Sequence, residues 1–154
     1  MMSGATLRVA TLRSADAADI PAMHRVRMSV RENRLTSTVL TEADYAREIT
    51  ATGRGWVMEV NDGNGGEIVG FAVGNLKDGS IWALFVDPAH EGRGYGRRLH
   101  NAVVTWLFDQ GLTYLWLTTG PDTRAFRFYK RAGWELVGKL ANGEVRMELA
   151  GFAG

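Results

Sequence analysis

Residues 81–99 read IWALFVDPAHEGRGYGRRL, where six apolar residues lead through Pro88 into three glycines at alternate positions and then into basic residues. An unbroken apolar run is typical of a strand that is covered on both faces, so residues 81–86 predict a central strand. Pro88 cannot donate a hydrogen bond to a strand ladder and therefore ends the strand. After the glycines, apolar residues recur at helical spacing, which predicts a helix over residues 97–110.

On both sides of this stretch the chain alternates between the hydrophobic period of a strand and that of a helix. Strands are predicted at residues 6–12, 56–60, 67–74, 80–86, 114–118, 134–138 and 144–149. Helices are predicted at residues 17–34, 97–110 and 123–132, with a further short helix that begins after Thr41. Asp16 and Thr41 are the expected N-caps of the first two helices, and Gly111 and Gly133 are the expected stops of the last two.

The order of these elements, β-α-α-β-β-β-α-β-α-β-β, predicts the class of fold. Turn-forming residues at 61–66, 78–79 and 142–143 predict hairpins, and hence antiparallel pairing of the strands that they join. The strand, helix and strand between residues 80 and 118 predict one right-handed βαβ unit with parallel strands. We therefore expect a single domain over residues 1–154 with an α+β, three-layer fold. Its mixed, mostly antiparallel twisted sheet should have about seven strands and about four helices.

The composition of the 154 residues is that of a globular protein, with 45% hydrophobic and 23% charged residues. The absence of cysteine excludes disulfide bonds, thiolate metal sites and a cysteine nucleophile. The histidines His24, His90 and His100 show no metal-ligand spacing, so no metal site is expected. Nineteen glycines exceed the usual level of about 7%, which indicates either many turns or a backbone that must approach another group closely.

Charge and hydropathy narrow the range of partners. Eighteen basic and seventeen acidic residues leave a formal net charge of +1, so no strong field favours nucleic acid or an anionic membrane. No apolar run approaches the roughly 18 residues of a membrane-spanning helix, and the N-terminus lacks a secretory hydrophobic segment. We therefore expect a cytoplasmic protein with neither nucleic acid nor membrane as a partner.

The glycines at 92, 94 and 96 lie between a buried strand and a helix N-terminus, where backbone N–H groups and the helix dipole favour a phosphate. A nucleotide-hydrolase loop of the type G-x-x-x-x-G-K-[ST] is disfavoured because no lysine follows these glycines. The dinucleotide fingerprint G-x-G-x-x-G matches neither the spacing G-x-G-x-G nor the antiparallel strands before it. Two interpretations stay open, a site for the diphosphate of coenzyme A and a tight turn without a ligand.

A second segment, residues 118–134, reads TTGPDTRAFRFYKRAGW. Together with the first it resembles the GNAT superfamily of N-acetyltransferases, whose acyl-CoA loop is written [QR]-x-x-G-x-[GA] and whose later signature is A-x-x-F-Y-x-x-x-G-[FW]. Residues 91–96 align with the loop, and the later signature is met by Ala125, Phe128, Tyr129, Gly133 and Trp134. The element order of the whole chain also matches this family.

This resemblance implies a GNAT-like fold and an enzyme that uses acetyl-CoA as co-substrate and no metal. The backbone at residues 84–86 would hold the pantetheine arm and the thioester, and the glycine loop would hold the diphosphate. Tyr129 matches the position of the general acid toward the departing thiolate, and a phenol with a pKa near 10 stays protonated at neutral pH. The alternative for Tyr129 is a core aromatic residue on an amphipathic helix. The implied cofactor-binding residues are Leu84, Phe85, Val86, Gly92, Arg93, Gly94, Tyr95, Gly96, Arg97 and Asp122.

Two residues depart from the pattern of the family. Glu91 stands where glutamine or arginine is usual, and a carboxylate beside a diphosphate is unfavourable unless it points away or pairs with Arg93 or His90. Because backbone N–H groups supply most of the binding, we expect the loop to tolerate it. Asp122 stands where asparagine is frequent, and capping of the following helix is its alternative role.

Attack on a thioester requires a free amine, since an ammonium group has no lone pair. Some family members carry a glutamate on the strand that corresponds to residues 114–118, but that strand has no acid here. Glu32 lies where the family forms part of its acceptor pocket and is the first choice as the catalytic proton acceptor. Glu59 and His24 are the other candidates, and a solvated charge is the alternative for each. Without cysteine, direct transfer in a ternary complex is the simplest mechanism.

The sequence thus predicts an N-acetyltransferase that acts on a primary amine of a small molecule or a peptide. Two alternatives stay open: a non-catalytic acyl-CoA-binding or regulatory domain, and acetylation of a protein N-terminus or lysine. The expected acceptor region favours an acceptor with a carboxylate or phosphate because it contains the arginines Arg25, Arg27, Arg31 and Arg34. A homodimer through the C-terminal hairpin is compatible with this fold.

Overall fold

A seven-stranded sheet forms the centre of the computed structural model, which describes residues 9–30, 40–61, 63 and 65–151. Its strands are Val9–Ser14 (β1), Gly53–Asn61 (β2), Gly66–Asn75 (β3), Ser80–Val86 (β4), Tyr114–Thr119 (β5), Glu135–Lys139 (β6) and Val145–Ala150 (β7). They lie in the order β1-β2-β3-β4-β5-β7-β6, and every neighbouring pair is antiparallel except β4 and β5. The predicted fold class, a mixed and mostly antiparallel sheet with helices on its faces, is confirmed.

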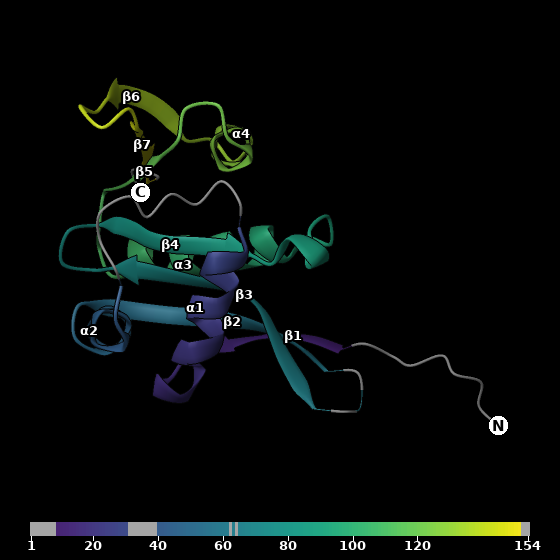
Figure 1. Cartoon of the computed structure of the whole chain (residues 1–154). Coiled ribbons are helices and arrows are strands. Elements are labelled where there is room, and N and C mark those ends of the chain that lie inside the picture. Colours follow the sequence, from purple (N-terminus) through teal and green to yellow (C-terminus); the bar gives the residue numbers. More distant parts are fainter. Residues whose placement is uncertain (1–8, 31–39, 62, 64, 152–154) are drawn as a thin grey trace.

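Within the described residues, four α-helices cover the two faces of this sheet. They are Ile20–Ser29 (α1), Glu42–Thr50 (α2), Tyr95–Asp109 (α3) and Arg124–Arg131 (α4), with 3₁₀ turns at Ala17–Asp19 and Pro88–His90. Figure 1 shows α1 crossing in front of β2, β3 and β4, with α3 behind them. The core accordingly has two parts, one cluster that includes side chains of α3 and α4 and another that includes side chains of α1 and α2.

The N-caps predicted for the first two helical segments are present. Asp16 caps the 3₁₀ turn that leads into α1, and Thr41 caps α2 through a capping box. The expected helix over residues 17–34 is too long, because α1 ends at Ser29 and Val30 has an extended backbone with ψ of 115°. The Ser29 hydroxyl donates a hydrogen bond to the backbone carbonyl three residues earlier at 2.6 Å, a bond that competes with a further helical turn.

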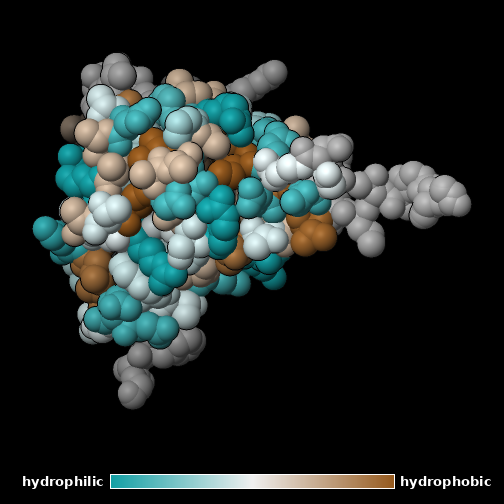
Figure 2. Space-filling model, turned by 90° about the horizontal axis from the view of Figure 1, so that it is seen from below, coloured by the Kyte–Doolittle hydropathy of each residue, from teal (hydrophilic) through white to brown (hydrophobic). Residues whose placement is uncertain are grey.

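The surface view from below shows how hydrophobic side chains are spread over one face of the molecule. Hydrophobic areas on this face are small and lie between hydrophilic ones (Figure 2). None of the helices in the described residues is long and apolar enough to cross a membrane. The large apolar side chains are instead gathered mainly in the two core clusters.

Strands β4 and β5 touch at one end only. Among the described residues their single register pair is Ser80 with Trp116, and the Trp116 backbone N–H donates to the Gly79 carbonyl at 3.1 Å. The Trp116 indole N–H adds a bond to the Asp78 carbonyl at 2.8 Å. A bulge in the β3–β4 ladder shifts the register directly beyond this point. Past Ser80, the described part of the chain therefore places no strand on the β5 side of β4, and the two parallel strands diverge.

Strand β3 approaches α3 closely at Gly74. A Cβ atom at this position would lie 2.6 Å from Cγ2 of Val103 and 3.0 Å from Cδ1 of Leu107, and both of these residues are fully buried. α3 therefore packs this closely on the sheet because Gly74 has no side chain. The same packing sets the position of the N-terminus of α3, which borders the site described below.

The substitution Gly74→Ala should destabilise the protein, because the side chains of α3 would have to move away from the sheet. Overpacking of this kind typically costs about 1–3 kcal/mol, which urea unfolding followed by tryptophan fluorescence would measure. The matched control is Gly138→Ala in β6, where a Cβ meets no atom within 4 Å. The control should change the free energy of unfolding by less than about 0.5 kcal/mol. Equal stability of Gly74→Ala and the wild type would contradict the close packing.

Candidate active site

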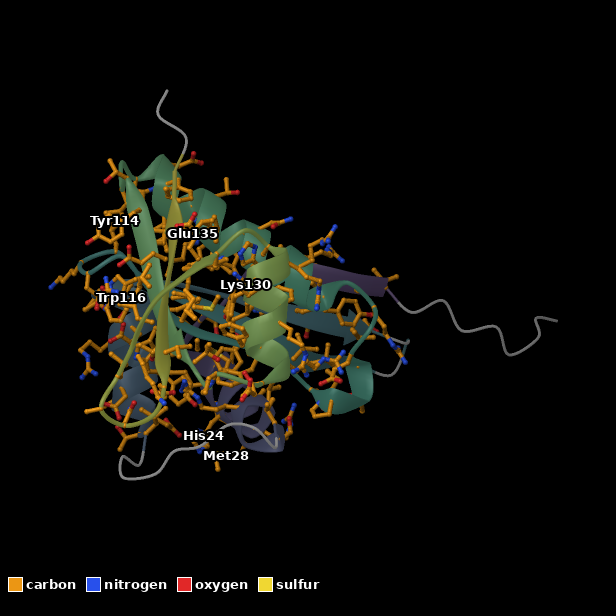
Figure 3. All side chains as sticks on the ribbon, turned by 90° about the horizontal axis from the view of Figure 1, so that it is seen from above. His24, Met28, Tyr114, Trp116, Lys130 and Glu135 are labelled. Carbon is orange, nitrogen blue, oxygen red and sulfur yellow. The ribbon has the colours of Figure 1, made fainter. Side chains whose placement is uncertain are left out.

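The divergence of β4 and β5 opens a cleft of about 660 Å³ at the carboxyl ends of these strands. Its walls come from β4, β5, the glycine-rich loop before α3, and α4. In the view from above, α4 is marked by Lys130 and β5 by Trp116 (Figure 3). Open sheets that contain parallel strands commonly bind ligands at such a place, beyond the carboxyl ends of the strands.

One wall of the cleft is the edge of β4, where the lining residues are Leu84, Phe85 and Val86. On their other side these three residues pair with β3. Backbone N–H and C=O groups of β4 that point toward the cleft have no strand opposite them in the described part of the chain. A strand edge of this kind can pair with an extended, amide-containing ligand.

The glycine-rich loop forms a second wall. Gly92 and Gly94 have φ angles of +77° and +82°, which side-chain-bearing residues rarely adopt. Gly94 is the N-cap of α3, and because no side chain caps this helix end, the first N–H groups of α3 lack a side-chain acceptor. N–H groups at a helix N-terminus, together with the helix dipole and a nearby guanidinium group such as that of Arg97, favour an anion. The loop residues that line the cleft are Gly92, Gly94, Tyr95, Gly96 and Arg97.

The carboxylate of Glu91 is paired, but not with either of the expected partners Arg93 and His90. Its Oε2 atom lies 2.7 Å from Nη1 of Arg124, the first residue of α4. This ion pair joins the glycine-rich loop to α4 across the cleft. It also balances the negative charge that would otherwise repel an anion on the loop. Arg124 could not be assigned from the loop motif, because the pair spans more than thirty residues.

Tyr129 of α4 lines the cleft and is buried, with 6% of its surface exposed. Its ring packs against Phe128 and Trp134, at centroid distances of 5.3 and 5.5 Å. Burial raises the pKa of Tyr129, so its hydroxyl group holds its proton at neutral pH. None of the described residues forms a hydrogen bond with this hydroxyl group.

None of the three residues that the sequence suggested as proton acceptors is among the described residues that line the cleft. Glu32 lies outside the described residues. Glu59 of β2 pairs with Arg13 at 3.1 Å, and His24 of α1 shares a hydrogen bond of 2.8 Å with the Tyr45 hydroxyl group. Neither is among the cleft-lining residues, and Figure 3 shows His24 apart from Lys130 of α4.

A carboxylate that the sequence analysis missed does line the cleft. Glu144 lies directly before β7, and its Oε1 atom accepts a hydrogen bond of 3.2 Å from the side chain of Asn142. The Asn142–Gly143 turn was recognised in the sequence. What brings Glu144 to the cleft, however, is the antiparallel pairing of β7 with β5, which starts with Thr119 opposite Val145. No local signal in the sequence marks this long-range pairing.

Comparison with known proteins identifies the family. The family model described as "Acetyltransferase (GNAT) family" matches residues 20–134, a range that contains the glycine-rich loop and Tyr129. The chain belongs to this family. The resemblance inferred from the two sequence motifs is thereby confirmed.

Two curated relatives of this GNAT chain are named Mycothiol acetyltransferase. The one from Kytococcus sedentarius is 32% identical over 108 residues, which cover 68% of this chain and 36% of the relative. The one from Rhodococcus erythropolis is 40% identical over 58 residues, which cover 37% of this chain and 19% of the relative. The chain thus spans only part of the length of both relatives.

Solved structures of GNAT proteins share the fold over nearly the whole chain. The ribosomal-protein-S18-alanine N-acetyltransferase from Escherichia coli has a TM-score of 0.72 at 19% identity and covers 95% of this chain and 97% of its own. The PaiA N-acetyltransferase from Thermoplasma acidophilum, solved in complex with coenzyme A, has a TM-score of 0.78 at 12% identity. In this case the match covers 93% of this chain and 99% of the other. At such low identities the likeness concerns the fold.

Two of the residues expected at the GNAT cofactor site are not among the residues that line the cleft, namely Arg93 and Asp122. The alternative role of Asp122 as helix cap is wrong, because Thr123 caps α4 by accepting the backbone N–H of Phe126 at 3.1 Å. The Asp122 backbone carbonyl instead accepts a hydrogen bond from Arg127. The described residues contain no group of three or more His, Asp or Glu side chains that could hold a metal ion.

Proposed function

We propose that this GNAT domain transfers an acetyl group from acetyl-CoA to a primary amine by direct attack in a ternary complex. One observation carries the proposal: the free edge of β4, the uncapped N-terminus of α3 and the buried Tyr129 all border the same cleft. The strand edge would bind the pantetheine arm, the helix N-terminus would bind the diphosphate, and Tyr129 would serve the departing thiolate. The structural neighbour from Thermoplasma acidophilum, solved with coenzyme A, supports the choice of donor.

The chemistry of the lining residues fits coenzyme A. A Cβ atom at Gly94 would meet no atom within 4 Å, so the backbone there is open to a diphosphate. The amide groups of the pantetheine arm would pair with the backbone of residues 84–86, as an added strand pairs with a sheet edge. Glu91 is already paired with Arg124, which supports tolerance of a carboxylate in this loop. Bound in this way, acetyl-CoA supplies the acetyl group as an activated thioester.

Tyr129 would act as the general acid. In the transfer, a bond forms between the amine nitrogen and the acetyl carbon, the bond from that carbon to sulfur breaks, and sulfur leaves with the electron pair. The proton that neutralises the thiolate would come from the Tyr129 hydroxyl group. Because burial raises the pKa of Tyr129, its hydroxyl group stays protonated at neutral pH and can donate a hydrogen bond to the thiolate as it develops.

The amine must lose a proton as it attacks, and we assign this proton to Glu144, directly or through one water. The cleft-lining carboxylates of the described residues are Glu91, which is held by Arg124, and Glu144, which has no ion-pair partner there. Val145 and Met147 of β7 are buried in the cluster that includes α3. Glu144 directly precedes these residues and lines the same cleft as Tyr129. Glu32 remains the prediction from sequence for the same task.

The class of acceptor stays open between a small molecule and a peptide. The name of the two curated relatives favours a small molecule, whereas the Escherichia coli neighbour is named for a protein substrate. An anionic acceptor has less support than the sequence indicated. Arg25 donates to the Ile68 carbonyl at 3.2 Å, and Arg27 is buried and stacked on the rings of Trp82 and Phe85, so both help to pack α1 on the sheet.

A screen of amines, with free coenzyme A measured by a thiol reagent, should detect turnover in the wild type for at least one class among amino acids, polyamines, aminoglycosides and peptide N-termini. Tyr129→Phe should then lower kcat about 10²–10⁴-fold, because the thiolate would leave unprotonated, while the KM for acetyl-CoA changes little. Calorimetric titration with acetyl-CoA controls for binding. Binding without release of coenzyme A for any amine would favour the non-catalytic alternative, and unchanged turnover in Tyr129→Phe would remove its assigned role.

The anion site can be tested with two glycines at opposite ends of α3. Gly94→Glu should abolish binding of acetyl-CoA in calorimetry, because it places a side chain and a negative charge where the diphosphate would lie. The control is Gly111→Glu, which has the same positive φ and equally open surroundings at the far end of the helix. It should lose similar stability but keep its affinity. Equal affinities of the two variants would contradict the assigned site.

The assignment of Glu144 predicts a change in pH dependence. Glu144→Gln should lower kcat/KM for the amine about 10²-fold near neutral pH and recover part of it at alkaline pH, where more of the amine is already deprotonated. Glu148→Gln is the matched control, since Glu148 lies four residues further along the chain, in β7, and is held by Arg146 at 3.0 Å. A Glu144→Gln profile that coincides with that of the control at every pH would refute the role.

A further inference from the structure

One buried titratable side chain in the cleft has no part in the reaction as proposed above. His100 of α3 lines the cleft and has 6% of its surface exposed. Both of its ring nitrogens are engaged: Nδ1 lies 3.1 Å from Oδ1 of Asn101, and Nε2 lies 2.9 Å from the indole nitrogen of Trp134. Neither nitrogen is therefore free to exchange a proton with a substrate.

The partners of His100 fix its tautomer. The indole N–H of Trp134 can only donate a hydrogen bond, so Nε2 of His100 must accept and carries no proton. Nδ1 then holds the single ring proton and donates it to the Asn101 side-chain oxygen. The imidazole is thus neutral, and a second proton on Nε2 would remove the acceptor of the Trp134 bond.

The groups around His100 disfavour a positive charge. Burial lowers the pKa of His100, and Arg97, one turn earlier on α3, lowers it further, against the opposing effect of the Asn101 hydrogen bond. From α4, the rings of Phe128 and Tyr129 face it at centroid distances of 5.7 and 6.3 Å. The other ring packed on it is that of Trp134, directly before β6, at 6.2 Å.

The same contacts tie His100 to the proposed general acid. Trp134 packs on Tyr129 at 5.5 Å, and its indole group is anchored to α3 through the bond to His100. Tyr129 of α4 is therefore packed against an indole group that α3 holds in place. Trp134 stands at the last position of the signature G-[FW], where phenylalanine would need no such acceptor.

We propose that His100 is a positioning residue, which in its neutral Nδ1–H tautomer holds Trp134 and thereby fixes the position of the Tyr129 ring beside the cleft. This inference rests on the proposed function for its effect on turnover, but the tautomer and the hydrogen bond can be observed without it. It also predicts that His100 is neither the base nor the acid of the reaction. Protonation of His100 should release Trp134 and misplace Tyr129.

Imidazole nitrogen NMR of ¹⁵N-labelled protein at neutral pH tests the first half of the inference. We expect His100 to show the shifts of an Nδ1–H tautomer with an acceptor Nε2. Trp134→Phe should make protonation of Nε2 easier, because no indole N–H would then use this nitrogen as its acceptor. His100 should therefore titrate at higher pH than in the wild type. The Nε2–H tautomer in the wild type, or an unchanged titration in Trp134→Phe, would overturn the inference whether or not any acetyl transfer is found.

Turnover tests the second half, with three variants that separate positioning from folding. His100→Leu, which removes the acceptor, should lower kcat about 10²-fold with little change in the KM for acetyl-CoA. His100→Gln, whose side-chain oxygen can accept the indole N–H, should restore much of the loss. The double variant His100→Leu/Trp134→Phe should be no slower than His100→Leu, since the buried donor is gone as well. Wild-type kcat in His100→Leu, or no rescue by His100→Gln at equal melting temperature, would sink the positioning role.

If the wild type releases no coenzyme A with any amine, the proposed function fails and turnover cannot report on His100. The position of Tyr129 is then read from nuclear Overhauser contacts between its ring and those of His100 and Trp134. These contacts should weaken in His100→Leu and return in His100→Gln. Contacts that are unchanged in His100→Leu would refute the inference independently of activity.

Discussion

The cleft depends on the junction at which Trp116 holds β4 and β5 together, since no other register pair joins these two strands among the described residues. The backbone N–H of Trp116 bonds to the Gly79 carbonyl and its indole N–H to the Asp78 carbonyl, while the guanidinium group of Arg146 stacks on the ring at 4.5 Å. Two parallel strands that are fixed at one end and unpaired afterward leave a wedge between them. That wedge exposes the edge of β4 and gives α3 and α4 a cavity to border, so each functional group of the cleft follows from this one junction.

Much of the fold could be predicted from the sequence because its signals are local. Hydrophobic period, Asn-Gly turns and the caps at Asp16 and Thr41 act over a few residues, and the structure has every strand and helix in the predicted order. The end of α1 was missed because it depends on the backbone of Val30 and a serine hydroxyl group, which no periodicity reveals. The glycine excess has both of its suggested causes: Gly143 makes a turn with positive φ, and Gly74 permits close packing.

The residues of the candidate site likewise fall into two groups, those that local sequence motifs reveal and those that only the tertiary structure brings together. The loop glycines and Tyr129 belong to contiguous motifs, so the sequence alone could nominate them, and they do line the cleft. The partners that adjust their chemistry come from distant parts of the chain: Arg124 neutralises Glu91, and Trp134 bonds to His100 across 34 positions. These contacts are set by how α3, α4 and the sheet pack together. A pattern of residue types along the chain therefore nominates residues of the candidate site, whereas the charges and hydrogen bonds around them depend on the tertiary structure.

A net charge of +1 conceals a strong separation of charge within the cleft. At the N-terminus of α3 the helix dipole, the open N–H groups and Arg97 favour an anion, and the nearby carboxylate is cancelled by its own arginine. Glu144, which has no cation paired with it among the described residues, reaches the cleft from the hairpin between β6 and β7. A ligand that is anionic at one end meets the first group, and an acceptor that arrives as a cation meets the second. Because the two attractions come from different walls of one cleft, they favour a donor and an acceptor that are held by separate groups and meet where β4 and β5 separate.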